Sequence, residues 1–212
     1  MTNPWLTISA EDYEAHMASP EVGQLQVLNQ LFKVVLEEHR PESLAVLGCS
    51  TGNGFEHIDP RTTRRVVGID INPSYLGVAR ARFSGSIPML ELLEEDFTSP
   101  TFAIHPVSLI FAALVFEYVG VEKAVRNISR SLTPGGVLVA ALQLPSPTSA
   151  PVTKTRFQSL EALAPIMNLV SPEEFSLVCF ENGLRAVRHT RLPLEQGKEL
   201  HVGFYEKDES GE

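Results

Sequence analysis

Two short apolar runs joined by a glycine-rich stretch constrain the fold of this chain most. Residues 44–47 (Leu-Ala-Val-Leu) lead into Gly-Cys-Ser-Thr-Gly-Asn-Gly at 48–54, and a second apolar run, residues 66–69, ends at Asp70. Continuous apolar runs bounded by turn residues are typical of buried parallel strands. In open sheets of this kind, ligands lie beyond the carboxyl ends of the strands, where an acid can accept hydrogen bonds from a ribose. The stretch therefore predicts a nucleotide-like ligand held between the glycine loop and Asp70.

The glycine loop lacks the spacing of a dinucleotide site. That fingerprint, G-x-G-x-x-G, needs a third glycine so that a pyrophosphate can approach the N-terminus of a helix. Here Gly52 and Gly54 are followed by Phe-Glu-His at 55–57. A nicotinamide cofactor is therefore disfavoured, although it remains an alternative for a sheet of this type.

The loop resembles the first motif of the class I S-adenosylmethionine-dependent methyltransferases, which usually runs hydrophobic-acid-x-G-x-G-x-G. The chain has these residues of the pattern: Gly48, Cys49, Thr51, Gly52 and Gly54. It departs from the pattern at Val46, which replaces an acid that helps to hold the methionine end of the cofactor, and at Ser50, which replaces the second glycine. The resemblance extends to about residue 144, because residues 121–132 predict a helix that is followed by Thr-Pro-Gly-Gly and an apolar strand, in the family's order.

The resemblance implies an α/β fold, a three-layer Rossmann-like sheet of seven strands with helices on both faces. Seven apolar runs predict the strands: residues 44–47, 66–69, 89–93, 107–113, 137–142, 184–192 and 200–205. The last two runs are joined by a connection short enough for a hairpin, so the sheet should be mostly parallel with an antiparallel last strand. Ser19-Pro20-Glu21 predicts the start of a helix by its cap, its proline and its acid.

We expect a single domain over residues 1–212. Residues 1–18 form an N-terminal arm, which either packs on the body or lines the pocket through Trp5 or Tyr13. Residues 145–170 are rich in proline at their start and are then spaced for a short amphipathic helix. This segment is either a lid over the acceptor site or an ordinary connector.

The composition limits the partners. The formal net charge is −9 and opposes a nucleic-acid partner, because nucleic-acid affinity rests on Lys and Arg that neutralise phosphates. No basic-then-apolar leader and no apolar run of about 18 residues is present, so we expect no membrane association and a cytoplasmic location. Cys49 and Cys179 are far apart and the histidines show no ligand spacing, so no metal is predicted. Residues 206–212 are charged and predict a frayed tail, and the oligomeric state is not predicted.

The resemblance implies a set of cofactor-binding residues. Gly48, Cys49, Ser50 and Gly52 would form the loop, Asp70 would bind the ribose, Ile71 would pack on the adenine, and Asp96, Phe97 and Ala113 would complete the site. Asp70 also has a plainer interpretation, as the cap of the helix that begins near Pro73. Cys49 is a small buried residue in its plainer interpretation, because no partner base lies near it in sequence.

The acceptor side is indicated by Phe-Glu-Tyr-Val at 116–119, which resembles the Leu-Glu-His-Val of several small-molecule methyltransferases. Glu117 or Tyr118 would orient the acceptor or take its proton, or the segment simply begins a helix. The sequence thus predicts a methyltransferase that uses S-adenosylmethionine, gives S-adenosylhomocysteine as product, and acts on a small-molecule acceptor. The main alternative is a non-catalytic protein of the same fold that binds the cofactor, its product or another nucleotide.

Overall fold

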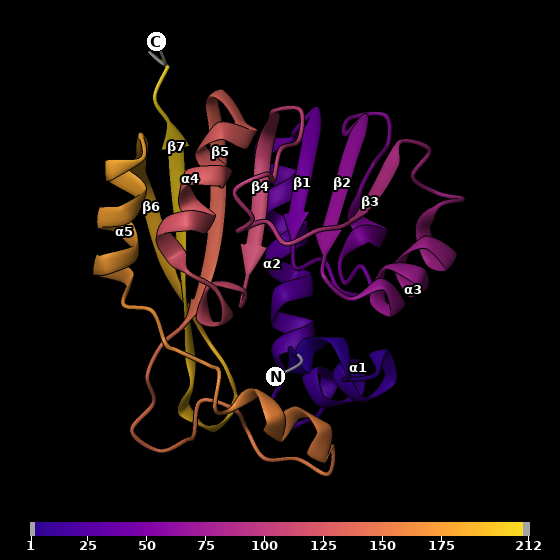
Figure 1. Cartoon of the computed structure of the whole chain (residues 1–212), viewed down its shortest axis with the longest axis vertical. Helices are drawn as coiled ribbons and strands as arrows, with labels where there is room; N and C mark the ends of the chain where they lie inside the picture. Colours follow the sequence, from indigo (N-terminus) through magenta and orange to yellow (C-terminus); the bar gives the residue numbers. More distant parts are fainter. Residues whose placement is uncertain (1–2, 210–212) are drawn as a thin grey trace.

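A single seven-stranded sheet organises the computed structural model, which describes residues 3–209 (Figure 1). The strands are β1 (Ser43–Leu47), β2 (Arg65–Asp70), β3 (Leu90–Glu94), β4 (Val107–Ala113), β5 (Leu132–Gln143), β6 (Leu184–Pro193) and β7 (Glu199–Lys207). Their order in the sheet is β3-β2-β1-β4-β5-β7-β6. All neighbouring pairs are parallel except those of β7, which is antiparallel to both β5 and β6. The predicted fold class is confirmed.

Helices cover both faces of this sheet. The α-helices are α1 (Ala10–Ala18), α2 (Gln24–His39), α3 (Pro73–Phe83), α4 (Val121–Ser131) and α5 (Pro172–Glu181). Short 3-10 helices are η1 (Pro4–Leu6), η2 (Phe55–His57), η3 (Phe116–Tyr118), η4 (Gln158–Leu163) and η5 (Glu195–Gly197). None of the helices in the described part of the chain combines the length and the apolar character needed to cross a membrane.

Alternating side chains of the central strands form the two halves of the core. On β1, Leu44 packs in one cluster with Phe32 and Val35 of α2. The next residue, Ala45, belongs to the other cluster, with Ile128 of α4. Successive side chains of a strand point to opposite faces, so a run that is apolar at every position requires a helix on each face.

Helix α2 begins later than the sequence predicts. The carbonyl oxygen of Ser19 accepts hydrogen bonds from the backbone N–H groups of Val22 and Gly23, at 3.0 and 2.9 Å. Gly23 then has a φ of +62°, a left-handed conformation that ends this turn, and α2 starts at Gln24. The cap signal at Ser19 therefore produces one isolated turn rather than the first turn of α2.

The predicted bounds or type of two other elements differ from the structure. The helix expected within residues 145–170 is the 3-10 helix η4, which ends before Pro165, a residue without an N–H for a helical hydrogen bond. Strand β5 begins at Leu132, five residues before the predicted apolar run, because Leu132 already pairs with Val107 of β4. The Thr-Pro-Gly-Gly stretch forms an irregularity between this pair and the next one, Leu109 with Val137.

The predicted tail, residues 206–212, overlaps the last strand. Glu206 and Lys207 belong to β7, and the Lys207 ammonium donates to the carbonyl oxygens of Ser129 and Leu132, each at 2.7 Å. The end of the expected tail, residues 210–212, lies outside the described residues, as do residues 1–2 of the expected arm.

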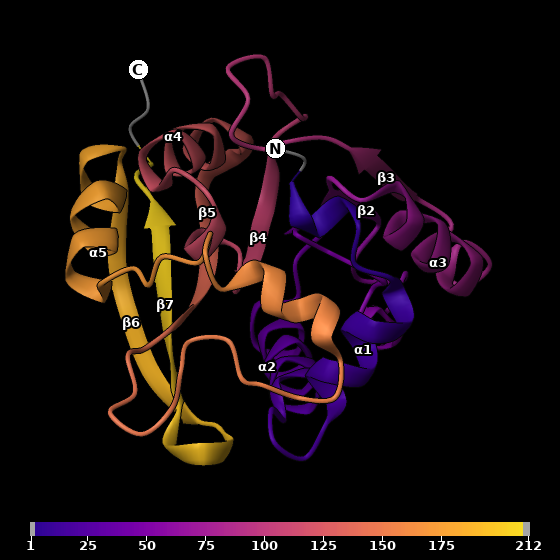
Figure 2. The same ribbon diagram turned by 60° about the horizontal axis from the view of Figure 1, so that its bottom comes forward.

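Two segments far apart in sequence lie across the carboxyl ends of β1, β2 and β4 (Figure 2). They are the N-terminal region with α1, and residues 145–170, called here the cover segment. Ser159 donates to the Asp12 carboxylate at 2.6 Å, and the ring of His16 pairs with the hydroxyl of Thr155 at 2.9 Å. These contacts join the two segments over the edge of the sheet where ligands of such folds bind.

Candidate active site

Asp70 connects the end of β2 to the glycine loop that follows β1. Its Oδ2 atom accepts a hydrogen bond from the backbone N–H of Ser50, and its Oδ1 atom from the backbone N–H of Asn72, each at 2.9 Å. Asn72, not Asp70, caps α3, because its side chain accepts from the N–H groups of Ser74 and Tyr75. Burial raises the pKa of Asp70, and the backbone N–H donors oppose that rise. Each carboxylate oxygen keeps a lone pair for a further donor.

The glycine loop needs glycine for different reasons at its two predicted positions. Gly48 has a φ of +64°, and a Cβ there would lie 2.3 Å from a methyl group of Val115. Gly52 has a φ of +85°, and its Cβ would lie 2.7 Å from the ring of Phe83. Gly48 thus allows the loop to pack closely against Val115, whereas Gly52 allows it to pack on Phe83 of α3.

Ser50 has a left-handed backbone conformation, which glycine adopts more readily than serine. Its φ is +48°, a region that residues with a Cβ rarely adopt. The hydroxyl of Ser50 is buried and interacts with the phenol of Tyr13, and this contact opposes the rise in the pKa of Tyr13 that burial causes. Leu114, which follows the neighbouring strand β4, is also left-handed, with a φ of +56°. Strained non-glycine residues therefore stand at the ends of both central strands, as is common where a site is built.

A cavity of about 370 Å³ opens at this edge of the sheet. Most of the residues predicted from the sequence border it: Gly48, Ser50, Asp70, Ile71, Asp96, Phe97, Ala113 and Tyr118. Three predicted residues do not: Cys49, Gly52 and Glu117. The cavity also extends to residues that the sequence did not single out, among them Thr153 and Lys198.

Cys49 packs inside the sheet rather than toward the cavity. It is buried, and a Cβ on Gly68 of β2 would lie 2.9 Å from its sulfur atom. Burial raises the pKa of its thiol well above the ordinary value, so the group stays protonated. This geometry matches the plainer interpretation of Cys49 as a small core residue, with its backbone in the loop.

Asp96 and Phe97 border the cavity from the turn after β3. The Oδ1 atom of Asp96 accepts from the backbone N–H and the hydroxyl of Thr98, at 2.8 and 2.7 Å. Phe97 is buried in the core cluster that contains α4. One carboxylate oxygen of Asp96 thus organises the turn, while the exposed side chain remains accessible to a ligand.

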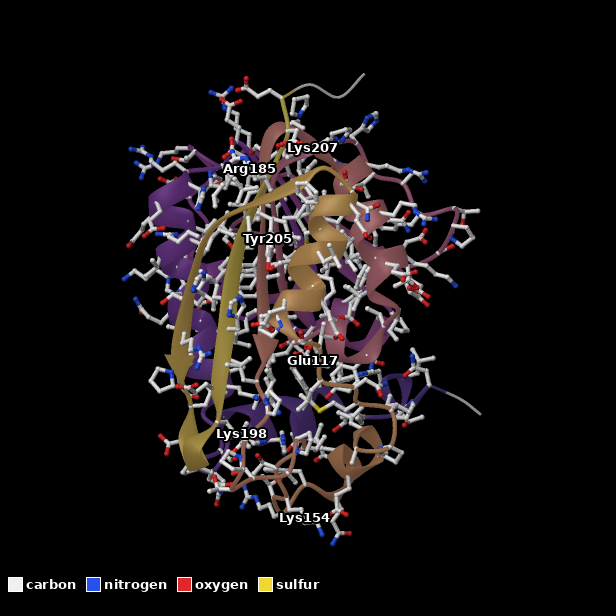
Figure 3. All side chains as sticks on the ribbon, turned by 90° about the vertical axis from the view of Figure 1, so that its left-hand side faces the viewer. Glu117, Lys154, Arg185, Lys198, Tyr205 and Lys207 are labelled. Atoms are coloured by element: carbon white, nitrogen blue, oxygen red, sulfur yellow. The ribbon has the colours of Figure 1, made fainter. Side chains whose placement is uncertain are left out.

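Glu117, labelled in Figure 3, is buried and does not border the cavity. Its Oε1 atom accepts from the backbone N–H of Gln143 at 2.7 Å, and its Oε2 atom has no partner in the described chain. The carbonyl oxygen of Glu117 accepts from the N–H of Asn168 in the cover segment at 2.8 Å. Burial raises the pKa of the carboxyl to about 7. Glu117 therefore ties η3 to β5 and to the cover segment, and would act on a ligand only through Gln143.

Aromatic side chains of the N-terminal region and η3 form one wall of the cavity, called here the aromatic wall (Trp5, Tyr13 and Tyr118). The ring of Trp5 meets the ring of Tyr118 edge-on at 5.0 Å and the ring of Tyr13 at 6.0 Å. Tyr13 in turn stacks on Tyr75 of α3 at 5.4 Å. Burial raises the pKa of Tyr13 to about 12. Of the two interpretations of the N-terminal arm, the structure shows the one in which Trp5 and Tyr13 line the pocket.

Sequence reasoning missed the polar residues at the other end of the cavity. They are His16, Gln24, Gln143, Thr153 and Lys198. Lys198 lies in a Glu-Gln-Gly-Lys-Glu connection that has the composition of a solvated turn. No local pattern marks it, because the partners that bury it come from residues 151–153 of the cover segment.

Known proteins include a matching domain family and solved structures with the same fold. Residues 45–140 match the family described as Methyltransferase domain. The N-methyltransferase NodS from Bradyrhizobium japonicum WM9, in complex with S-adenosyl-L-homocysteine, is 17% identical with a TM-score of 0.67, covering 93% of this chain and 97% of NodS. The geranyl diphosphate C-methyltransferase from Streptomyces coelicolor A3(2) is 15% identical with a TM-score of 0.64, covering 88% and 82%. The cyclase SpnF is 13% identical with a TM-score of 0.67, covering 87% and 83%.

Identities this low show the fold alone, and the search of curated proteins found no match. The family match adds the domain type. Its residues run from β1 into β5 and include the glycine loop and Asp70. Residues 45–140 therefore match a methyltransferase domain, and the sheet as a whole has the fold of methyltransferases such as NodS.

Proposed function

We propose that this protein transfers a methyl group from S-adenosylmethionine to a small-molecule acceptor bound in the cavity. The observation that carries the proposal is the hydrogen bond between Asp70 and the N–H of Ser50. It holds a carboxylate and a buried hydroxyl side by side at the border of one cavity. Each oxygen of the Asp70 carboxylate keeps a lone pair beyond its backbone donor, so the carboxylate fits a ligand that supplies hydroxyl donors.

The cofactor fits the residues at this end of the cavity. Asp70 would accept hydrogen bonds from the ribose hydroxyls with its remaining lone pairs. Gly48, whose left-handed conformation turns the chain after β1, would present its backbone to the methionine part. The other proposed contacts are Ile71 and Phe97 with the adenine ring, Asp96 with its amine, and Ala113 with the edge of the site; Cys49 and Gly52 would contribute through the backbone of the loop.

The chain's own contribution to the reaction is alignment and exclusion of water. The bound cofactor supplies an activated methyl group, which the nucleophilic acceptor atom takes as the sulfonium becomes a neutral thioether. The aromatic wall and the cover segment close the space above the strand ends, which favours a small acceptor. The named substrates of the structural relatives, such as geranyl diphosphate, are small molecules too.

Tyr118 would orient the acceptor as a hydrogen-bond donor. It borders the cavity, and burial raises the pKa of its hydroxyl well above the ordinary value of 10. A phenol with a raised pKa keeps its proton near pH 7, so it donates a hydrogen bond more readily than it removes a proton. Glu117 would be a positioning residue that fixes the N–H of Gln143.

The first test is ligand binding. Calorimetry with S-adenosylhomocysteine should show binding, whereas NADH should show none. Transfer of a radiolabelled methyl group to a panel of small acids, amines and phenols then measures turnover. Binding of NADH in preference to S-adenosylhomocysteine would contradict the proposed function.

A further inference from the structure

Lys198 is a buried cation that borders the same cavity. It lies between η5 and β7, at the end of the β6–β7 hairpin (Figure 3), and is 5% exposed. Its ammonium donates to the carbonyl oxygen of Pro151 at 2.8 Å and to the hydroxyl of Thr153 at 2.7 Å. An ammonium has three protons, and the structure gives the third no partner among the described residues. One donor is therefore available to a ligand.

No carboxylate lies within ion-pair distance of Lys198 in the described part of the chain. Its sequence neighbour Glu199 pairs with Arg191 instead, at 3.4 Å. The titratable group that faces Lys198 from α1 is His16, and burial, with a smaller contribution from the charge of Lys198, lowers the pKa of that imidazole. A buried charge without a counter-ion is costly. The arrangement is stabilised when an anion enters the cavity.

The position of Lys198 separates it from the cofactor end. In the strand order, β1, β4 and β5 lie between β2, which carries Asp70, and β7, which follows Lys198. Four strand spacings of about 4.8 Å amount to roughly 19 Å between the two strands. Lys198 is thus on the side of the cavity away from β2, which the proposed cofactor contacts leave free for the acceptor.

The surroundings of Lys198 combine a neutral polar network with apolar walls. The Gln143 amide donates to the same Pro151 carbonyl oxygen at 2.9 Å and accepts from the Gln24 amide at 3.1 Å. The apolar residues that border this cavity from α1, α2 and the cover segment include Met17, Leu28, Leu160, Leu163 and Met167. One cation among neutral and apolar groups suits a ligand with a single negative charge on an apolar body.

We propose that the methyl acceptor is an apolar small molecule with one carboxylate, and that Lys198 binds this carboxylate. The proposal rests on the proposed function, since it names the substrate class of that site. It assigns Lys198 to the acceptor rather than to the cofactor. The carboxylate need not be the methylated group.

The test compares isosteric probes that differ in charge. Phenylacetate and phenylacetamide, and likewise decanoate and decanamide, are titrated calorimetrically into protein saturated with S-adenosylhomocysteine. We expect each carboxylate to bind at least tenfold more tightly than its amide. Lys198→Met should remove this difference, whereas the control Lys154→Met should preserve it, because Lys154 is exposed on the same cover segment (Figure 3).

Two outcomes would overturn the proposal. One is equal affinity for carboxylates and amides in the wild-type protein, or no binding of either. The other is a loss of S-adenosylhomocysteine affinity in Lys198→Met, which would assign the ammonium to the cofactor's own carboxylate. The titrations are repeated without S-adenosylhomocysteine, so that failure of the wild type to bind that ligand rejects the proposed function while the probe pairs still decide the role of Lys198.

A measurement on the wild-type protein covers the case in which Lys198→Met does not fold. Burial lowers the pKa of Lys198 to about 8, and a bound anion favours the charged form. Carboxylate affinity should therefore fall as the pH rises above about 8, while amide affinity stays constant. His16, with its lowered pKa, is neutral throughout this range. A carboxylate affinity that does not change from pH 7 to 10 would contradict the proposal.

Discussion

The carboxylate of Asp70 reaches from the end of β2 to the N–H of Ser50 in the glycine loop after β1, at 2.9 Å. This hydrogen bond means that Asp70 organises the loop in addition to its proposed contact with the ribose. Substitution at Asp70 should therefore affect both stability and ligand affinity.

We predict that Asp70→Ala lowers the affinity for S-adenosylhomocysteine at least tenfold and destabilises the fold by about 1–3 kcal/mol, because the N–H of Ser50 loses its buried acceptor. Calorimetry and urea unfolding measure the two effects. Asp59→Ala is the control, since Asp59 pairs with Arg61 at the surface. Unchanged affinity in Asp70→Ala would contradict the assignment of Asp70 to the cofactor.

Ser50 offers a test of backbone strain. Its φ of +48° favours glycine, so Ser50→Gly should be more stable than Ser50→Ala by about 1 kcal/mol. Both variants lack the hydroxyl and should lose similar amounts of S-adenosylhomocysteine affinity if that hydroxyl binds the cofactor. Thermal unfolding of the two proteins side by side checks the order, and greater stability of Ser50→Ala would argue against strain at this position.

Glu117 should make the protein less stable as the pH rises. Its folded pKa of about 7 exceeds the ordinary value of 4.5, so the folded state binds the proton more tightly than the unfolded state. The contribution of Glu117 is complete below about pH 4.5 and is lost as the pH rises through 7, by up to about 3 kcal/mol. Glu117→Gln removes this titration, so its stability relative to wild type should increase between pH 5 and pH 8 in urea unfolding. A constant difference across that range would exclude a raised pKa.

The Tyr118→Phe variant tests whether the hydroxyl of Tyr118 acts as a hydrogen-bond donor or as a general base. If the hydroxyl only donates to the acceptor, turnover should fall by about tenfold, comparable to one lost hydrogen bond, and the pH dependence of kcat/KM should keep its shape. The measurement is methyl transfer to the best acceptor of the panel from pH 6 to 10. Loss of an ascending limb of the profile in Tyr118→Phe would indicate that Tyr118 removes the proton.

The sheet and the cofactor end could be predicted because local patterns encode them. The continuous apolar run at residues 107–113 is a strand with the predicted bounds, and Asp70 was found because it comes directly after such a run, residues 66–69. The start of α2 was wrong because the cap signal at Ser19 competes with the left-handed Gly23. A short motif cannot tell which of two nearby turns continues as a helix.

The acceptor end could not be predicted from local patterns. Lys198 and His16 become neighbours in one cavity only through the cover segment, whose fold depends on contacts with α1. Glu117 was predicted from a family resemblance, but its direction, toward Gln143 and away from the cavity, depends on the pairing of β4 with β5. The cytoplasmic location stays a prediction.

The antiparallel direction of β7 determines where the turn that carries Lys198 lies. Because that strand returns antiparallel, the hairpin before it delivers Lys198 to the edge where the parallel strands end. Selectivity for the acceptor would then depend on the turn between β6 and β7 and on the cover segment, and not on the residues proposed to bind the methyl donor. Replacing Lys198 would then remove the preference for carboxylates and leave the donor site unchanged.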